Sequence, residues 1–163
     1  MNKIDLKTSE FSEIYKFSNR TKSIVKTLLD RTYEEGCMVG FDPRQLNPAH
    51  IHSGETCIIR FPKTNYSKKE IHVAFDLAHE LGHHFDPITY EEQDKIEKRY
   101  ISELKAWVKA TKIMLLIDLT RHEELEYFRY MTYCINTYER EYLRIKTSKM
   151  VEDGGFEPPP SYS

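Results

Sequence analysis

Residues 73–83 of this chain read Val73-Ala74-Phe75-Asp76-Leu77-Ala78-His79-Glu80-Leu81-Gly82-His83. Two histidines four residues apart lie on one face of an α-helix, so His79 and His83 can both point at one metal ion. Glu80 then lies beside that ion, where it can accept a proton from water instead of binding the metal. This pattern is typical of zinc-dependent hydrolases, and two surface histidines paired by chance are the less favoured interpretation.

The residues around the motif predict a helix with one buried face. Ser67-Lys68-Lys69-Glu70 has the form of a capping box, which predicts that the helix begins at Ser67. Apolar and small residues then recur at helical spacing: Ile71, Ala74, Phe75, Ala78 and Gly82. Asp86-Pro87 disfavours helical geometry and predicts an end near His84 or Phe85.

A catalytic zinc site usually has a third protein ligand and leaves one position for water. A third histidine six residues after His83 is excluded, because Thr89 occupies that position. The next predicted helix, from about residue 92 to 114, carries a core-facing stripe of Ile96, Tyr100, Glu103, Trp107, Ala110 and Met114. Glu103 is the one carboxylate in this stripe, and a charge there is costly unless a cation meets it. We therefore predict Glu103 as the third ligand. The alternatives are a buried Arg or Lys partner, or a place at the edge of the stripe in water.

Several other polar residues have weaker interpretations. Glu91, Glu92 and Glu97 fit a solvated helix face. Asp76 is predicted to accept a hydrogen bond from a ligand histidine, and Asp86 to lie near the ligands without binding the metal. Among the remaining histidines, solvated surface is expected for His72 and His84, a loop for His50 and His52, and a helix start for His122.

The motif at residues 77–83, combined with Glu103-x-x-Ala106-x-x-x-Ala110, resembles the ImmA/IrrE family of small zinc metallopeptidases. The resemblance covers about residues 55–114. It implies a gluzincin-type site in which His79, His83 and Glu103 bind one Zn²⁺ and Glu80 is the catalytic base. It also implies a substrate such as a transcriptional repressor of a phage or mobile element. Trp107 and Lys109 depart from the family pattern, which leaves the metal site intact and the substrate open.

Length and composition predict the domain organisation, the state of the cysteines and the location of the protein. A chain of 163 residues with 39% hydrophobic content predicts one compact domain, here residues 1–150, followed by a disordered tail at 151–163. Cys37, Cys57 and Cys134 have unrelated spacings, which indicate neither a disulfide framework nor a cysteine-type zinc site. They predict three free thiols in a reducing cytosol. A net charge of −2 gives no nucleic-acid footprint. The polar N-terminus and short apolar runs predict a cytoplasmic protein without a signal peptide or membrane span.

The fold class predicted is α+β: a mainly helical, zincin-like metallopeptidase domain with a small β-sheet before the motif helix. A helix containing Ile24, Val25, Leu28 and Leu29 should be closed by Gly36. Strands are predicted at residues 38–41 and 56–61, separated by a loop at 42–54. Residues 57–60 are expected to form the edge that pairs with a substrate peptide, and a plain core strand is an equal alternative. A second capping box, Thr120 to Glu123, predicts a long helix whose tyrosines pack against the core.

The function predicted is that of a zinc-dependent endopeptidase hydrolysing a peptide bond of a specific intracellular protein. Its partner would be a protein or peptide substrate, with no direct contact to nucleic acid or membrane. Tyr33, Tyr100 and His52 are suggested as further donors to the oxyanion. The alternative is a non-catalytic zinc-binding regulatory or interaction protein, such as a toxin–antitoxin component or a repressor partner.

Overall fold

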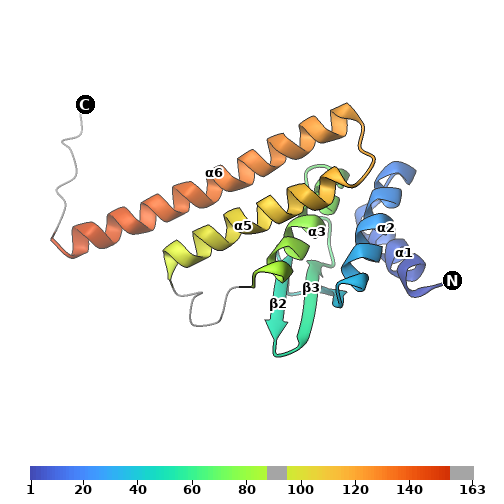
Figure 1. The fold of residues 1–163 in the computed structure, drawn as a ribbon, viewed down its shortest axis with the longest axis horizontal. Helices are drawn as coiled ribbons and strands as arrows, with labels where there is room; N and C mark the ends of the chain where they lie inside the picture. The colour runs from blue at the N-terminus through green and yellow to red at the C-terminus, as the bar shows by residue number, and fades with distance from the viewer. Residues whose placement is uncertain (88–94, 155–163) are drawn as a thin grey trace.

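The computed structural model describes residues 1–87 and 95–154, which form an α+β fold (Figure 1). The elements are α1 (Lys3–Tyr15), α2 (Asn19–Glu34), β1 (Cys37–Asp42), β2 (Ala49–Ser53), β3 (Thr56–Pro62), α3 (Glu70–Phe85), α5 (Ile96–Leu115) and α6 (Arg121–Glu152). The predicted class is confirmed at this level. Residues 155–163 of the predicted tail lie outside the described residues, and α6 continues two residues past the predicted boundary, to Glu152.

The three strands form one sheet in the order β1-β3-β2, with β1 parallel and β2 antiparallel to β3. β1 and β3 match the predicted strands, whereas β2 falls in the segment predicted as a loop. β2 is short and carries two histidines, so its pattern is weak, and the two-residue connection Gly54-Glu55 is the signal for a hairpin. Gly54 has a φ of +59°, which favours glycine. The predicted edge at residues 57–60 is wrong, because β3 is paired on both sides and β2 is an edge strand.

Helix α3 lies at the centre of the molecule and contacts the sheet, α2, α5 and α6 (Figure 1). All of its residues from His72 to Gly82 are buried. The helix ends at Phe85 as predicted, but it begins at Glu70, three residues later than the capping box indicated. The Glu70 carboxylate does not cap its own helix. It accepts hydrogen bonds from the backbone amide and hydroxyl of Ser18 and from the hydroxyl of Thr21, at the start of α2.

Helices α3 and α5 approach closely at Gly82. A Cβ atom on Gly82 would clash with the carbonyl oxygen of Ala106 and lie 3.0 Å from its carbonyl carbon. The predicted stripe of α5 faces this contact, with Trp107, Ala110 and Met114 buried. The two helices can approach this closely because Gly82 has no side chain and faces the backbone of Ala106.

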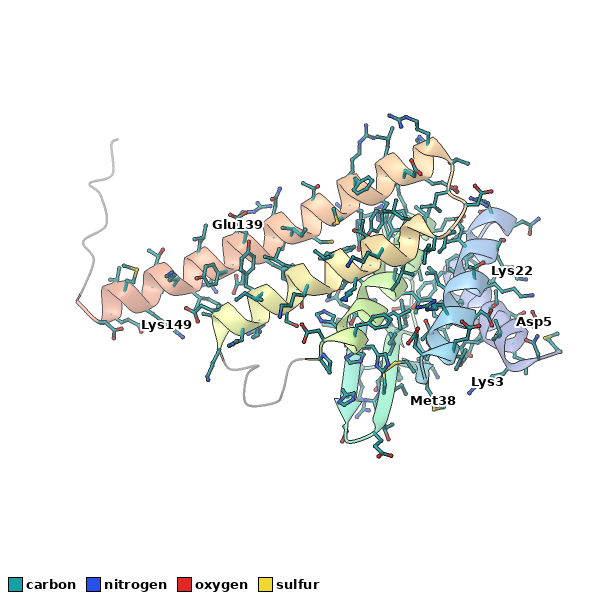
Figure 2. The ribbon with its side chains drawn as sticks, viewed as in Figure 1. Lys3, Asp5, Lys22, Met38, Glu139 and Lys149 are labelled. Atoms are coloured by element: carbon teal, nitrogen blue, oxygen red, sulfur yellow. A yellow bond between two sulfur atoms is a disulfide. The ribbon has the colours of Figure 1, made fainter. Side chains whose placement is uncertain are left out.

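The capping box at the start of α6 is confirmed, since Thr120 and Glu123 bond reciprocally. Glu123 also binds Arg20 of α2, and this guanidinium lowers the pKa of Glu123 to about 2. Farther along, Met131 and Ile135 pack against the core, whereas Phe128 is exposed. Figure 2 places Lys149 on the part of α6 that extends past α5. Within residues 1–87 and 95–154, no helix combines the length and apolar character needed to cross a membrane.

The close helix contact predicts the effect of Gly82→Ala. Helix propensity alone would favour the alanine by about 1 kcal/mol. The clash with α5 reverses the sign, and we expect a loss of about 1–3 kcal/mol in the free energy of unfolding, measured by urea denaturation. Gly40→Ala is the matched control, because its Cβ would meet Ile58 Cδ1 at an ordinary 3.6 Å. Equal stability of the Gly82→Ala variant and the unmodified chain would contradict the contact.

Candidate metal centre and active site

Two adjacent turns of α3 and one turn of α5 bring together the three residues predicted as ligands. His79 Nε2 lies 2.9 Å from Glu103 Oε2, and His83 Nε2 lies 3.4 Å from the same oxygen. The two imidazole rings are 4.7 Å apart between centroids. His79, Glu80 and His83 also each offer a donor atom within 4.8 Å of the other two. The predicted grouping of His79, Glu80, His83 and Glu103 is therefore present.

This geometry fits a small divalent cation. In a tetrahedral zinc site with bonds of about 2.1 Å, ligand atoms lie roughly 3.4 Å apart. The distance of 3.4 Å from His83 to Glu103 matches this separation, and the distance of 2.9 Å from His79 to Glu103 is shorter, as in a direct hydrogen bond. Within the described parts of the chain, the ion-pair partners of Glu103 are His79 and His83, and no Arg or Lys is among them. The carboxylate is thus half-buried against two groups that are neutral in their ordinary state, where a cation would supply the missing charge.

The pKa values of Glu103, His79 and His83 are shifted by burial and by the contacts among these three side chains. Burial would raise the pKa of Glu103, but hydrogen bonds from His79 and His83 hold it well below its usual range. Burial lowers the pKa of His79, which favours a neutral imidazole able to bind a metal. Burial also lowers the pKa of His83, but the contact with Glu103 raises it by more, so the pKa of His83 lies above its ordinary value. Proton and metal ion would therefore compete for this histidine.

Neighbouring side chains orient the two imidazoles through contacts that the sequence did not predict. Ser102 Oγ lies 3.4 Å from His83 Nδ1, which leaves Nε2 facing Glu103. The His79 ring stacks on Trp107 at 4.2 Å between centroids. His79 Nδ1 is buried without a hydrogen-bond partner among the described residues. The positions of Ser102 and Trp107, one residue before Glu103 and four after it, are the signal that a helical-wheel argument could have used.

Two predicted supporting roles are not observed. Asp76 does not bond a ligand histidine, because its carboxylate accepts hydrogen bonds from Tyr66 at 2.6 Å and Tyr130 at 2.8 Å. Burial raises the pKa of Asp76 to about 6 in spite of these bonds. Asp86 is exposed and pairs with Lys105 at 3.0 Å, so it takes no part in orienting the histidines.

Glu80 is 8% exposed and lies beside the candidate ligands. Burial raises its pKa to about 8, and the nearby Glu103 and Asp76 carboxylates add to this, whereas His83 and the backbone amide of His50 act in the opposite direction. A carboxyl group with a pKa near neutrality can both accept and donate a proton. The structure thus gives Glu80 a suitable environment for acid–base chemistry.

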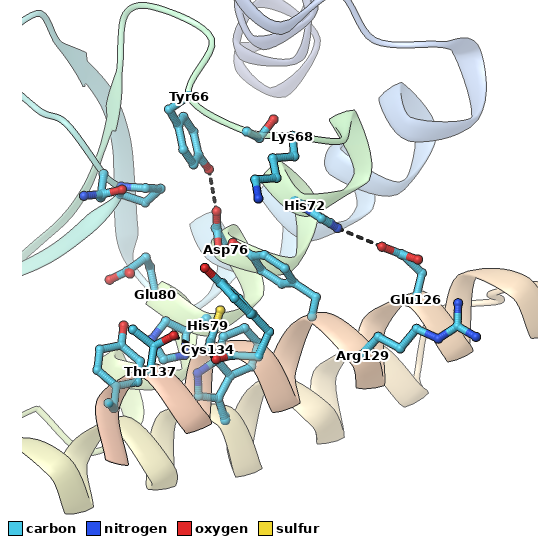
Figure 3. A pocket seen from close by; sticks show the side chains of 17 residues that line it. Tyr66, Lys68, His72, Asp76, His79, Glu80, Glu126, Arg129, Cys134 and Thr137 are labelled. Atoms are coloured by element: carbon cyan, nitrogen blue, oxygen red, sulfur yellow. Dashed lines mark hydrogen bonds and ion pairs between the residues drawn. The ribbon is translucent and has the colours of Figure 1, made fainter. Parts of the chain in front are cut away.

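A cavity of about 620 Å³ opens beside His79 and Glu80 (Figure 3). α3 forms one wall and α6 another, and Asn47 and Pro48, just before β2, complete it. At one end Figure 3 shows His72 facing Glu126, at 3.0 Å. The cavity therefore leads from the candidate metal centre along α3 and α6, and it can accommodate several residues of an extended chain.

Tyr138 of α6 is the hydroxyl that the sequence analysis missed, because the tyrosines of this helix were assigned to packing. It lines the cavity, and burial together with the Glu103 and Glu80 carboxylates raises its pKa. Its phenol therefore stays protonated and can donate a hydrogen bond in the site. The three donors suggested from sequence are not among the cavity-lining residues: Tyr100 stacks on Tyr142, His52 is exposed, and the Tyr33 ring faces Lys3.

Four other histidines differ from their predicted places. His72 is buried, bonds Glu126 and stacks on Tyr130 at 4.1 Å, so it is not solvated surface. His50 and His52 lie in β2 and not in a loop. His84 is half-buried and bonds the Glu35 carbonyl at 3.0 Å. Each of these contacts joins segments far apart in the sequence, which is why local patterns did not predict them.

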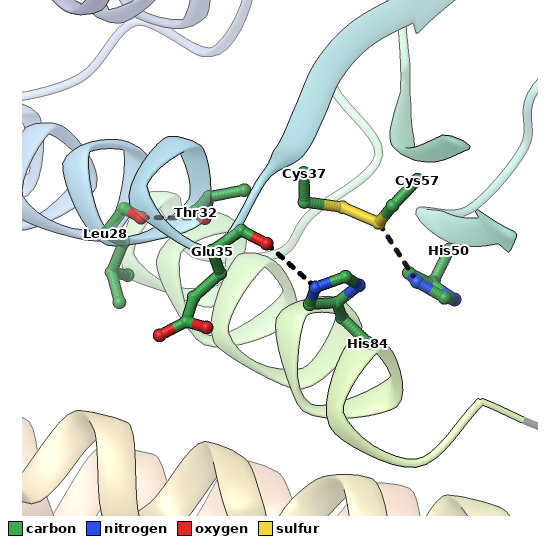
Figure 4. The surroundings of a disulfide bond; sticks show 7 residues. All are labelled: Leu28, Thr32, Glu35, Cys37, His50, Cys57 and His84. Carbon is green, nitrogen blue, oxygen red and sulfur yellow. Dashed lines mark hydrogen bonds between the residues drawn. A yellow bond between two sulfur atoms is a disulfide. The ribbon is translucent and has the colours of Figure 1, made fainter. Parts of the chain in front are cut away.

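The prediction of three free thiols is wrong for two of them. Cys37 and Cys57 form a disulfide between β1 and β3, and Cys134 is free (Figure 4). The two cysteines are register partners in the parallel β1–β3 pair, with Cα atoms 4.8 Å apart, within the range that a disulfide needs. The twenty-residue separation of the two cysteines in sequence shows nothing of this register.

A scan against models of known families, a search of curated proteins and a search of solved structures each found no match to this chain. The resemblance of residues 55–114 to the ImmA/IrrE family therefore stays a prediction. Any function assigned to the chain has to follow from the chemistry of the candidate metal centre and the cavity beside it.

The raised pKa of Glu80 predicts a pH-dependent stability difference in the metal-free protein. An ordinary glutamate has a pKa of about 4.3, whereas the pKa of Glu80 in the folded protein is about 8. The contribution of protonated Glu80 to the free energy of unfolding is therefore fully present below about pH 4.3 and is lost as the pH rises towards 8. Glu80→Gln removes this loss. We expect the variant to gain on the unmodified chain by up to about 1.4 kcal/mol per pH unit in that window.

Urea denaturation of both metal-free proteins at several pH values measures this difference. Asp76 titrates in both proteins, so its contribution cancels in the comparison. Glu139→Gln, on the exposed face of α6, is the control and should show no such trend. A stability difference that is constant with pH would contradict the assigned environment of Glu80.

Proposed function

We propose that this protein is a zinc-dependent metallopeptidase. The observation that carries the proposal is the convergence of His79, His83 and Glu103 from two helices, at 2.9 and 3.4 Å, beside a buried Glu80 and an open cavity. Two imidazoles and one carboxylate form a donor set used by catalytic zinc sites, which leave a position free for water. His79, His83 and Glu103 would hold the ion.

Bound there, a Zn²⁺ ion would act as a Lewis acid that lowers the pKa of water and polarises a carbonyl oxygen. Glu80 would accept the proton of the attacking water as its oxygen adds to the carbonyl carbon. Tyr138 would donate a hydrogen bond to the carbonyl oxygen as negative charge develops on it. Glu80 would then transfer its proton to the leaving amine as the C–N bond breaks.

The edge of the sheet suggests how a peptide is held. β2 pairs with β3 along one side, and the residues before β2 line the cavity next to Glu80. A substrate in extended conformation could add to the other side of β2 through backbone hydrogen bonds, while its side chains enter the cavity between α3 and α6. We therefore assign the pairing with a substrate peptide, predicted for residues 57–60, to the neighbouring strand β2. In agreement with the sequence resemblance, the proposed substrate is a specific intracellular protein, such as a transcriptional repressor, in the cytoplasm.

The central test compares cleavage and metal content in the same variants. A proteome-derived peptide library is incubated with the zinc-loaded protein, and new termini are identified by mass spectrometry. We expect Glu80→Gln to reduce cleavage by at least about 100-fold while zinc content stays unchanged, because Glu80 moves protons and binds no metal. With the Cys37–Cys57 disulfide intact, Glu103→Ala should lose both cleavage and zinc.

Glu97→Ala is the control for Glu103, since Glu97 is an exposed acid on the same helix. If the unmodified protein binds zinc and cleaves no peptide, or if Glu80→Gln cleaves as well as the unmodified chain, the alternative of a non-catalytic zinc-binding regulatory protein is correct. Full zinc content in Glu103→Ala would place the third ligand elsewhere.

The proposed role of Tyr138 has its own test. Tyr138→Phe removes the hydroxyl and keeps the ring, so turnover should fall by about 100-fold while KM and zinc content change little. Tyr133→Phe is the matched control, because this tyrosine also lines the cavity from α6 but is 60% exposed, compared with 36% for Tyr138. Unchanged turnover in Tyr138→Phe would remove this residue from the reaction.

A further inference from the structure

A second group of metal-binding side chains lies on the other side of the last turn of α3 (Figure 4). It contains Cys37 of β1, His50 of β2, Cys57 of β3 and His84 of α3, and each offers a donor atom within 4.8 Å of the others. The four residues come from four different elements. None of them takes part in the proposed peptidase chemistry.

The imidazole of His84 is oriented as that of a metal ligand would be. Its Nε2 lies 3.0 Å from the Glu35 carbonyl oxygen, which can only accept a hydrogen bond, so Nε2 carries the hydrogen. In the neutral ring, Nδ1 then presents a lone pair. This Nδ1 is buried and has no hydrogen-bond partner in the described residues. Metal-bound histidines commonly donate their second ring N–H to a backbone carbonyl in this way.

The other three donors complete the group. His50 Nε2 lies 3.2 Å from Cys57 Sγ, and the His50 and His84 rings are 5.9 Å apart between centroids. Cys37 and Cys57 are almost fully buried, so no bulk water competes for their sulfur atoms. Figure 4 shows the His84 ring bonded to the Glu35 carbonyl on one side and near His50 on the other, with His50 facing Cys57.

We propose that Cys37, His50, Cys57 and His84 bind a second zinc ion when the Cys37–Cys57 disulfide is reduced. Two sulfur and two nitrogen donors in a closed, tetrahedral arrangement are typical of structural zinc sites. Disulfide and metal are alternative states of the same four side chains, because the sulfur atoms can bind zinc only as thiolates. The site is separate from the one formed by His79, His83 and Glu103.

The exchange between the two states balances with a thiol reductant. Two thiol groups of a dithiol transfer two electrons and two protons to the Cys37–Cys57 bond and become a disulfide themselves. The two cysteine thiols that result lose their protons to water as zinc binds. A disulfide of the oxidised dithiol reverses the sequence: it accepts two electrons and two protons and becomes a dithiol, while Cys37 and Cys57 re-form their disulfide and release the metal.

The position of this site suggests what it does. It would join all three strands to the end of α3, where His84 directly follows His83. The rings of His50 and His83 are 6.4 Å apart between centroids, so the two metal sites would be near neighbours. In the reduced protein, zinc would take over the cross-link between β1 and β3 that the disulfide provides, and it would add a link from the sheet to α3.

Cobalt(II) substitution tests the proposal without reference to peptidase activity. Cysteine thiolates bound to cobalt give a near-ultraviolet charge-transfer absorption that histidine and carboxylate ligands do not. The full-length protein, reduced with a dithiol and titrated with cobalt under anaerobic conditions, should show this band. The oxidised protein should not, and reduction should raise the zinc content by one ion per chain.

Variants separate the two sites. Glu103→Ala should keep the charge-transfer band and lose the other metal, whereas Cys57→Ser should lose the band. His84→Gln should weaken metal binding at the second site by more than about 100-fold, since the loss of an outer hydrogen-bond partner alone costs 10–100-fold. Cys134→Ser and His52→Gln are the matched controls and should leave the band unchanged.

The measurement on the unmodified chain decides the question even where a cysteine variant fails to fold. The proposal is overturned if the reduced, folded protein shows no thiolate–cobalt band, or if reduction leaves the zinc content unchanged. A negative result here leaves the peptidase proposal standing, because peptide cleavage and the effect of Glu80→Gln are measured independently.

Discussion

The contact between Gly82 and the backbone of Ala106 is the constraint on which the rest of the site depends. It allows α3 and α5 to approach so closely that no Cβ fits between them. Glu103 lies one turn before Ala106 on α5, and His79 lies one turn before Gly82 on α3, so the same contact sets the separation between carboxylate and imidazoles. A larger residue at position 82 would move the acid away from the histidines even if every ligand were kept.

A second constraint is that ionisable groups are buried while the protein itself does not offset the full cost of removing their charges from water. Glu80 and Asp76 both have raised pKa values, of about 8 and about 6, because they are removed from water. Glu103 is held ionised by hydrogen bonds from His79 and His83. Such an arrangement destabilises the metal-free fold, and a bound cation would offset that destabilisation. Shifted pKa values of this kind, which lower the stability of the fold, are common at catalytic centres.

Helix α6 gives the site its cavity. Glu123 binds Arg20 of α2, and Glu126 binds His72 of α3 and Lys69 directly before it. The first turns of α6 are therefore held against the core from two directions. The next turns then cover His79 and Glu80 at a distance that leaves a cavity lined by Tyr130, Cys134 and Tyr138. The sheet acts on the opposite side of α3, where Cys37, His50 and Cys57 meet His84. The motif helix is thus supported from both sides.

Local patterns in the sequence were enough to predict the α+β class, the end of α3, the α6 capping box and the grouping of His79, Glu80, His83 and Glu103. The first three features, and the pairing of His79 with His83, depend on helical periodicity and on residues a few positions apart. Glu103 lies 24 residues from His79, and it was predicted because a carboxylate in a buried helix face needs a cation. The role of Glu70 at α2, the strand β2, the Cys37–Cys57 pair and the place of Tyr138 beside Glu80 could not be predicted in the same way. Each depends on the register between segments distant in sequence, and that register is set by packing of the whole core.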